Sequence, residues 1–176
     1  AYGGSKFVME RLFVAANLDP RACGKTTLVC TRYGNVAYSS GSLMPKIMED
    51  RKSGVCELTD PRMTRFFMTL GEAVALVRRA AESAPAGSVL IPVLPSVRVT
   101  DVIAALAPDC EVKVIGIRGA EKIHECMVSA DEAPIADRFG SDYCLGLPTP
   151  KGIGGAYDSG TNPDVLSVEA IRERTP

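Results

Sequence analysis

Two kinds of hydrophobic spacing alternate along this chain of 176 residues, and the alternation constrains the fold more than any other feature. In some segments apolar residues recur every three or four positions, as on one face of an α-helix. Other segments are short runs rich in β-branched residues, as buried strands are. Strands that alternate with helices predict an α/β architecture. The predicted helices lie within residues 2–18, 39–54, 70–83 and 99–108, and the predicted strands within residues 26–36, 55–69, 88–94 and 111–117.

The helical segments show apolar faces that we expect to be buried. Residues 2–18 carry a broad apolar stripe that includes Phe7, Leu12 and Phe13. Residues 39–54 offer serine caps, a helix and a glycine stop, and residues 99–108 begin with a threonine–aspartate cap. In residues 70–83 two arginines occupy the face opposite the apolar one. The apolar face predicted for that helix consists of Ala73, Val74, Val77, Ala80 and Ala81, and the helix within 39–54 holds Met44, Ile47 and Met48.

The pattern weakens beyond residue 128. Proline and glycine crowd residues 145–163, so this stretch is predicted to be a long loop. The last apolar run reads as a closing helix, with Ser167 as N-cap and Glu169 in the first turn.

Composition excludes several classes of partner. The formal net charge of −1 leaves no basic field for nucleic acid, and no apolar run approaches the roughly 20 residues of a membrane span. The single histidine and the scattered cysteines form no metal-ligand motif, so no metal site is predicted. The six cysteines are expected to be reduced and mostly buried thiols of a cytoplasmic protein, namely Cys23, Cys30, Cys56, Cys110, Cys126 and Cys144.

The first residues carry the chemistry. Tyr2 and Lys6 are four positions apart, so on a helix they lie along one face. An ammonium beside a phenol favours the phenolate and lowers the tyrosine pKa from about 10. A tyrosine tuned in this way can exchange a proton with a sugar hydroxyl near neutral pH. The same spacing also occurs by chance on surface helices, so the pair needs support from other residues.

That support comes from motifs in a fixed order. A predicted strand ends in TRYGNV (31–36), and GSLMP (41–45), LTDPRMTRFFMTL (58–70), IGIRGAEKIHE (115–125) and SGTNPDVLSVEAI (159–171) follow. With Tyr2 and Lys6, this series resembles the extended short-chain dehydrogenase/reductase superfamily, and within it the UDP-N-acetylglucosamine 4,6-dehydratases (inverting), polysaccharide biosynthesis proteins. The resemblance runs nearly end to end.

The resemblance implies a fold and a division of the chain. It implies the C-terminal half of a Rossmann-type doubly wound parallel sheet together with a small substrate-binding domain. Residues 1–40 would end the dinucleotide-binding domain. Residues 41–176 would bind mainly the sugar nucleotide, with some elements returning to the Rossmann sheet.

The resemblance also implies roles for residues. Tyr2 and Lys6 would serve the redox step, and both would contact the cofactor, NADP rather than NAD. Asn35 would bind the sugar nucleotide, although an asparagine there could simply form a turn. His124, the one histidine, is expected to make structural hydrogen bonds in its loop. The implied substrate-binding residues are Asn35, Arg62, Met63, Thr64, Arg65, Arg118 and Glu121.

This sequence departs from the family pattern at some positions and lacks some of the family's motifs. Members of the family usually show a proline–glycine pair after the arginine, where Gly119 and Ala120 stand here, which leaves the geometry at Arg118 open. The glycine-rich cofactor turn and an upstream Asp–Lys pair of the family have no counterpart in these residues. We therefore expect the C-terminal half of a longer enzyme, inactive without its N-terminal half and a homo-oligomer when intact.

For the intact enzyme the resemblance implies three steps on UDP-N-acetylglucosamine. Hydride leaves C4, water is lost across C5 and C6, and the hydride returns to C6 while C5 is reprotonated with inversion. The product belongs to pseudaminic acid or other surface-polysaccharide biosynthesis in the cytoplasm, and helices upstream could still anchor a membrane form. The alternatives are a UDP-sugar 4-epimerase, a retaining 4,6-dehydratase and a non-catalytic sugar-nucleotide-binding fragment.

Overall fold

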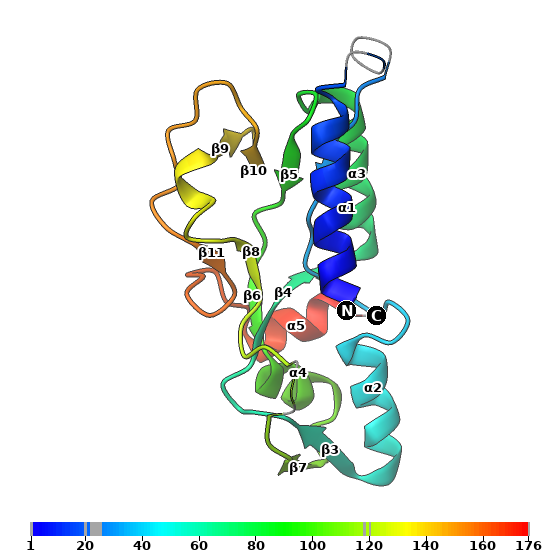
Figure 1. Cartoon of the computed structure of the whole chain (residues 1–176). Coiled ribbons are helices and arrows are strands. Elements are labelled where there is room, and N and C mark those ends of the chain that lie inside the picture. Colours follow the sequence, from blue (N-terminus) through cyan, green and yellow to red (C-terminus); the bar gives the residue numbers. More distant parts are fainter. Residues whose placement is uncertain (1, 20, 22–25, 118, 120, 176) are drawn as a thin grey trace. The chain divides into compact units, whose positions relative to one another are not determined.

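A computed structural model describes residues 2–19, 21, 26–117, 119 and 121–175 (Figure 1). The chain has a mixed α/β fold, as predicted, and divides into two compact units, each built from three separate segments. Unit 1 consists of Ala1–Tyr33, Val74–Val93 and Val128–Ala156. Unit 2 consists of Gly34–Ala73, Leu94–Met127 and Tyr157–Pro176. The predicted assignment of residues 1–40 and 41–176 to cofactor and substrate stays a prediction.

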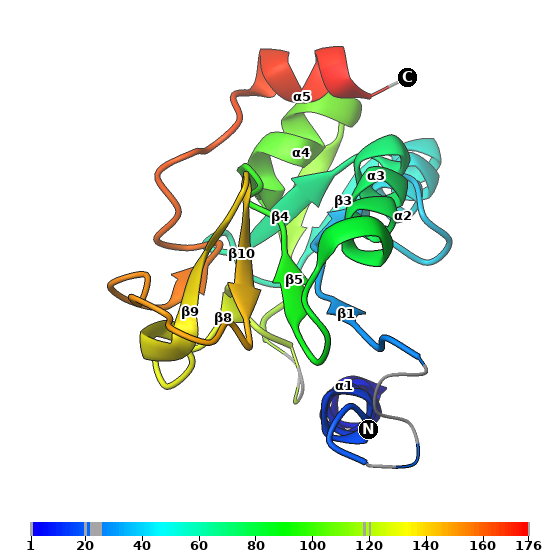
Figure 2. The same cartoon turned by 90° about the horizontal axis from the view of Figure 1, so that it is seen from above.

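Unit 1 contains a four-stranded sheet in the order β1–β5–β10–β9. Strand β1 runs parallel to β5, whereas β10 is antiparallel to both β5 and β9. Figure 2 shows β5, β10 and β9 in this order. The elements of this unit are α1 (Tyr2–Ala16), β1 (Cys30–Thr31), β5 (Val89–Ile91), η2 (Ala133–Ile135), β9 (Ala136–Phe139) and β10 (Asp142–Leu145), and helix α3 (Leu70–Ser83) begins in unit 2 and continues into unit 1.

The described residues of unit 2 form three α-helices and one 3₁₀ helix, together with a three-stranded sheet and a two-stranded sheet. In one sheet β2 is parallel to β4 and β6 is antiparallel to β4, and in the other β3 is parallel to β7. The elements are β2 (Asn35–Val36), α2 (Leu43–Asp50), η1 (Arg51–Ser53), β3 (Val55–Leu58), β4 (Thr64–Met68), β6 (Ser96–Arg98), α4 (Val99–Leu106), β7 (Glu111–Val114), β11 (Tyr157–Asp158) and α5 (Val168–Arg174). Strand β8 (Cys126–Val128) pairs with β11.

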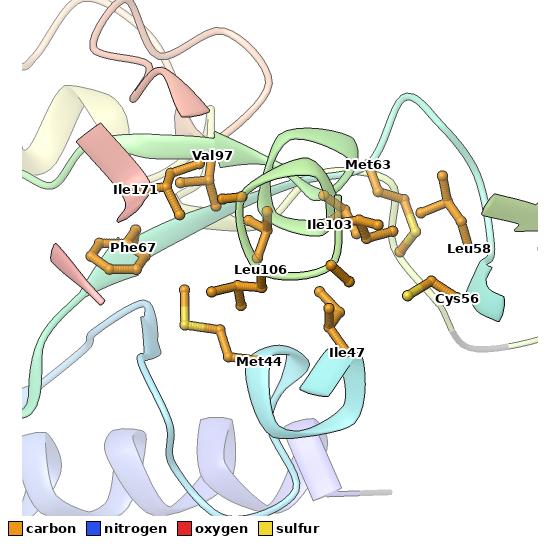
Figure 3. Close-up of a cluster of buried hydrophobic side chains, with 14 residues drawn as sticks. Met44, Ile47, Cys56, Leu58, Met63, Phe67, Val97, Ile103, Leu106 and Ile171 are labelled. Atoms are coloured by element: carbon orange, nitrogen blue, oxygen red, sulfur yellow. The ribbon is translucent and has the colours of Figure 1, made fainter. Parts of the chain in front are cut away.

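The core of unit 2 is a cluster of 14 buried residues (Figure 3). Helix α4 supplies five of these residues, and the others come from α2, β3, β4, β6 and α5 and, in loops, from Met63 and Ala107. In the figure Met44 and Ile47 approach from α2, while Phe67 and Ile171 lie at the end of the cluster opposite Leu58 and Cys56. The described core of unit 1 includes a smaller cluster around Leu76, Ala80, Leu90 and Cys144.

Several predicted elements are confirmed. The helix predicted within residues 39–54 is α2, where Met44 and Ile47 are buried while Met48 is 39% exposed. It ends through η1 at Gly54, whose φ of 77° is a left-handed conformation that glycine adopts without strain. Helix α5 begins after Ser167, whose side chain accepts a hydrogen bond from the Ala170 amide as predicted.

The predicted face of α3 is wrong in part. Ala73 and Ala80 are buried, but the third fully buried position is Leu76. Val74 and Val77 are 61% and 52% exposed. Both apolar stripes have helical spacing, so spacing alone could not distinguish the buried stripe from the exposed one.

Three other expectations also differ from the structure. The run predicted as one buried strand over residues 26–36 forms two separate, only partly buried strands, β1 and β2. Helix α4 begins at Val99 after Arg98, without the predicted side-chain cap. Beyond residue 128 the hydrophobic pattern is too weak to predict the hairpin that β9 and β10 form. The turn of this hairpin contains Gly140 at φ 62°.

The described cysteines are free thiols, but they are not mostly buried. Two of them, Cys56 and Cys144, are buried. Cys23 lies outside the described residues. The remaining ones are Cys30 and Cys110, which are partly buried, and Cys126, which is exposed. Among the described helices, none is both long and apolar enough to cross a membrane.

Candidate functional site

The predicted redox pair lies at the start of α1 in unit 1. Helix α1 begins at Tyr2, so Tyr2 and Lys6 are one helical turn apart, as the spacing predicted. Lys6 is exposed, whereas the side chain of Tyr2 lies outside the described part of the chain. The backbone therefore supports the pairing on one face, and the contact between phenol and ammonium stays a prediction.

Unit 2 holds a small hollow of about 20 Å³ beside β2 and β4. It brings together Asn35 and Arg65, two of the predicted substrate-binding residues. The surface that it exposes is apolar, and its volume is that of about one water molecule, far below the roughly 300 Å³ of typical ligand pockets. The other lining residues are Val36, Ala37, Ser42, Leu43, Met44, Phe66, Phe67, Val97 and Val102.

Strand pairing holds Asn35 at this hollow. Asn35 and Val36 pair with Phe67 and Met68 of β4 in parallel register. The neighbouring Gly34 allows the close approach, because a Cβ at that position would lie 2.6 Å from the Cβ of Phe66. Gly34 of the YGN motif is therefore required for the packing of β2 against β4, and this packing fixes the position of Asn35.

Ser42 also lines the hollow, although the sequence predicted only that serines within residues 39–54 would cap a helix. It does precede α2, but its side chain caps no helix amide. Its Oγ is buried and has no hydrogen-bond partner among the described residues. An unpaired buried hydroxyl is costly, so a ligand that supplied a polar atom here would remove that cost. A capping serine in the sequence carries no signal of this kind.

Arg65 is largely committed to holding a neighbouring segment. Its guanidinium donates to the carbonyl oxygens of Ile123 at 3.0 Å and Lys122 at 3.1 Å, and Nε lies 3.6 Å from Glu125. Burial lowers the pKa of Arg65. Arg65 thus positions residues 122–125 beside the hollow, which the sequence did not indicate.

Arg62 and Met63 differ from each other despite being adjacent. Arg62 is 68% exposed and donates to both carboxylate oxygens of Asp60, at 3.0 and 2.7 Å. Hydrogen bonds from Arg62 lower the pKa of Asp60 to about 2. Met63 is buried in the unit 2 core, so its side chain cannot take the substrate-facing place expected for it without leaving that core.

Thr64 connects two distant segments through its hydroxyl. Its Oγ1 lies 2.8 Å from Nδ1 of His124 and 2.7 Å from Oγ of buried Ser159. Ser159 in turn accepts a hydrogen bond from the Glu125 amide at 2.9 Å. Gly160 leaves room for the imidazole, because a Cβ there would lie 2.6 Å from the ring. These contacts support the structural role predicted for His124.

The remaining predicted residues lie between β7 and β8. Glu121 is exposed, and Arg118 lies outside the described residues. Unit 2 therefore brings Asn35, Arg65 and the unexpected Ser42 to one hollow, while the described contacts of Arg62 are with Asp60.

Comparison with known sequences places these features in a family. Residues 1–145 match the family described as polysaccharide biosynthesis protein. A UDP-N-acetylglucosamine 4,6-dehydratase (inverting) of Campylobacter jejuni is 40% identical over 146 residues, 82% of this chain and 43% of that protein. A UDP-glucose 4-epimerase of Rickettsia conorii is 38% identical over 149 residues, 81% of this chain and 43% of that protein. A protein of Methanocaldococcus jannaschii, described as an uncharacterized membrane protein, is 41% identical over 142 residues, 74% of this chain and 42% of that protein.

Solved structures agree on the fold. Pen from Bacillus thuringiensis superposes with a TM-score of 0.86 at 27% identity, over 98% of this chain and 56% of that one. TunA, an NAD-dependent NDP-hexosamine 5,6-dehydratase, gives a TM-score of 0.56 at 24% identity, over 68% of this chain and 42% of that one. This chain spans less than half the length of the curated relatives above. The family match over residues 1–145 covers most of this chain of 176 residues. The chain therefore belongs to the polysaccharide biosynthesis protein family.

Proposed function

We propose that the protein containing this chain is an inverting UDP-N-acetylglucosamine 4,6-dehydratase. The observation that carries the proposal is the family match together with the 40% identity to the Campylobacter jejuni enzyme of that name. The helical turn between Tyr2 and Lys6 supports it, as does the hollow that joins Asn35 and Arg65. Because the chain spans 43% of that relative, the proposal concerns a protein of the relative's length.

The residues of α1 fit a nicotinamide cofactor by their donor chemistry. Lys6 is an exposed ammonium one turn from a tyrosine, and it can donate hydrogen bonds to ribose hydroxyls. A bound nicotinamide would supply hydride acceptance and return. Tyr2 would take the proton of the sugar 4-hydroxyl, and the charge of Lys6 would favour the phenolate that this requires. NADP rather than NAD is part of the proposal.

The residues of unit 2 would hold the sugar nucleotide. Asn35 would hydrogen-bond the substrate from the rim of the hollow, and Ser42 would do so from inside it. Arg62 would release Asp60 to contact phosphate, since an exposed arginine fork suits that group. We assign Arg65 and Thr64 mainly to holding residues 122–125 in place, and Arg118 and Glu121 to substrate contact.

The proposal also assigns a setting. The product would enter pseudaminic acid or another surface polysaccharide, made in the cytoplasm by a homo-oligomeric enzyme. The 176 residues alone would turn over no substrate, because the glycine-rich cofactor turn and the acid–base pair of the family are not among them.

The test is product analysis by NMR with UDP-N-acetylglucosamine and NADP⁺ in D₂O. A protein of the relatives' length should give a 6-deoxy-4-keto sugar with a 6-methyl signal, deuterium at C5 and the inverted C5 configuration. The 176-residue chain serves as the negative control. Absence of a methyl product from active, folded long protein would refute dehydration, and a retained C5 configuration would refute inversion.

One second function has a specific observation in its favour. The Rickettsia conorii relative is described as a UDP-glucose 4-epimerase and is nearly as similar as the dehydratase. An epimerase would use the same tyrosine and lysine but would return hydride to C4. The NMR experiment separates the two, because epimerisation yields a 4-epimer and no methyl signal.

A further inference from the structure

Helix α1 lacks the apolar anchoring that usually fixes a helix. No side chain described between residues 3 and 16 of α1 is fully buried. The described part of unit 1 leaves its large apolar side chains about half uncovered, since Phe7, Val8, Met9, Leu12 and Phe13 are between 42% and 64% exposed. Amphipathic helices of globular proteins normally pack this kind of face against a core. Other contacts must therefore set the orientation of α1 on unit 1.

Those contacts converge on Arg32, which directly follows β1. Its Nε and Nη2 donate to the two carboxylate oxygens of Glu10 on α1, both at 2.7 Å. Its Nη1 and Nη2 donate to the carboxylate of Glu132, at 2.8 and 2.6 Å. The three side chains are only 20%, 12% and 17% exposed. One guanidinium thus joins α1, β1 and the turn before η2 by two bidentate pairs.

The surroundings reinforce this cluster of Glu10, Arg32 and Glu132. Arg11 of α1 reaches Glu132 at 2.7 Å, and the amide and hydroxyl of Ser129 both donate to Glu132 at 3.2 Å. A hydrogen bond from Arg32 is the main reason that the pKa of Glu132 falls to about 2. Glu132 is therefore charged at neutral pH, and both carboxylates of the cluster accept hydrogen bonds from Arg32.

The position of Glu10 on α1 links the cluster to the redox pair. Lys6 is one helical turn before Glu10, and Tyr2 is one turn before Lys6. Residues spaced by four lie along one side of a helix. The contact that fixes the rotation of α1 about its axis is therefore on the side that carries positions 2 and 6.

We propose that Arg32 is a positioning residue, which sets the rotation and axial position of α1 and thereby the placement of Lys6 and Tyr2. The role in catalysis rests on the proposed function, whereas the role in holding α1 does not. Arginine is required because its planar fork can meet two carboxylates bidentately, which the single ammonium of lysine cannot. Without that fork Glu10 and Glu132 would be left close together with too little positive charge between them.

The first experiment measures amide hydrogen exchange in α1 and needs no activity. The variants are Arg32→Lys and Arg32→Met, and the matched control is Arg79→Met. Arg79 also makes a bidentate pair in unit 1, with buried Asp142 at 2.9 Å for both bonds, and the side-chain bonds described for it involve no residue of α1. Amides of α1 should exchange about tenfold faster or more in the Arg32 variants and at the normal rate in the control. Unchanged exchange in α1 of folded Arg32→Lys would overturn the proposal.

The second experiment uses a protein of the relatives' length. Arg32→Lys should lower kcat roughly ten- to a hundredfold through misplacement of the reacting groups, with KM changed far less. A primary isotope effect with C4-deuterated substrate should grow, because hydride transfer becomes slower. Arg79→Met should change neither. A normal kcat and isotope effect in Arg32→Lys would overturn the catalytic part. If the unmodified protein dehydrates no UDP-sugar, the proposed function fails, and hydrogen exchange alone decides whether Arg32 anchors α1.

Discussion

Helix α4 of unit 2 and helix α1 of unit 1 are held by opposite kinds of interaction. Five of the eight residues of α4 are buried in the unit 2 core. In α1 none of the described side chains is buried, and the contacts with unit 1 are chiefly polar, through Glu10 and Arg11 of the helix and Asn17 directly after it. Apolar burial is strong but weakly directional, whereas bidentate ion pairs have strict geometry. The difference indicates that unit 2 relies on its core for stability, while α1 relies on polar contacts for orientation.

The largest expected effect tests the apolar half of this comparison. Ile103, in α4, is 2% exposed within the cluster of 14 residues, so Ile103→Ala should lower the free energy of unfolding by about 2–5 kcal/mol. Chemical denaturation measures the change. The control is Val114→Ala, because Val114 is 56% exposed. Equal losses in the two variants would contradict a stability dominated by the unit 2 core.

The polar half of the comparison predicts a dependence on pH. The pKa of Glu132 is lowered from 4.5 to about 2 in the folded chain. A carboxyl group whose pKa is lower in the folded state stabilises the fold at any pH above its unfolded-state pKa. This stabilisation is lost as the pH falls through the folded-state pKa. The wild type should therefore exceed Glu132→Gln in stability by on the order of 2–3 kcal/mol at neutral pH, and the difference should shrink between pH 4.5 and about 2. Unfolding curves over that range check this, and a difference that did not vary with pH would argue against the ion pair.

A backbone contact within unit 2 should have a smaller effect. Gly34→Ala places a methyl group 2.6 Å from the Cβ of Phe66 and 3.0 Å from its carbonyl oxygen, neither of which can rotate away. Overpacking of this kind costs about 1–3 kcal/mol. Thermal or chemical unfolding should show the loss in Gly34→Ala but not in Gly155→Ala, where an added Cβ meets open space. An unaffected Gly34→Ala would mean that β2 and β4 are less tightly paired than described.

The smallest expected effect returns to α1. Leu12 is 64% exposed, so Leu12→Ala should change the free energy of unfolding by less than about 0.5 kcal/mol. The same denaturation assay used for Ile103→Ala gives a direct comparison. A loss near that of Ile103→Ala would show that the apolar face of α1 is covered in solution, and it would remove the contrast between the two helices.

The sequence predicted much of the local structure, for identifiable reasons. The C-terminal end of α2 follows from the backbone preference of Gly54, and the start of α5 follows from the capping preference of Ser167. Both preferences act over a few residues. The α/β class follows from the alternation of the two hydrophobic periods along the chain. Local chemistry was sufficient in each case.

The candidate site was predictable only in part. The family resemblance assigned Asn35 and Arg65 to substrate binding, and both line the hollow. It could not show that Arg65 donates to the carbonyl oxygens of residues 122 and 123, or that Met63 belongs to the core, because both depend on segments distant in sequence. Ser42 was missed for the same reason, since its unpaired Oγ is defined by what surrounds it.

By itself the sequence determined which residues of each segment share a face and which chemistry the chain carries. The tertiary structure alone decided which face is buried: Leu76 rather than Val74 in α3, and Glu10 rather than Leu12 as the anchor of α1. Periodicity is a property of one segment, whereas burial and charge pairing require a second segment brought near by folding. Arg32 illustrates what a sequence cannot show. Its sequence position is only that of an arginine after a strand, and its role appears because folding brings Glu10 and Glu132 within hydrogen-bond distance of it.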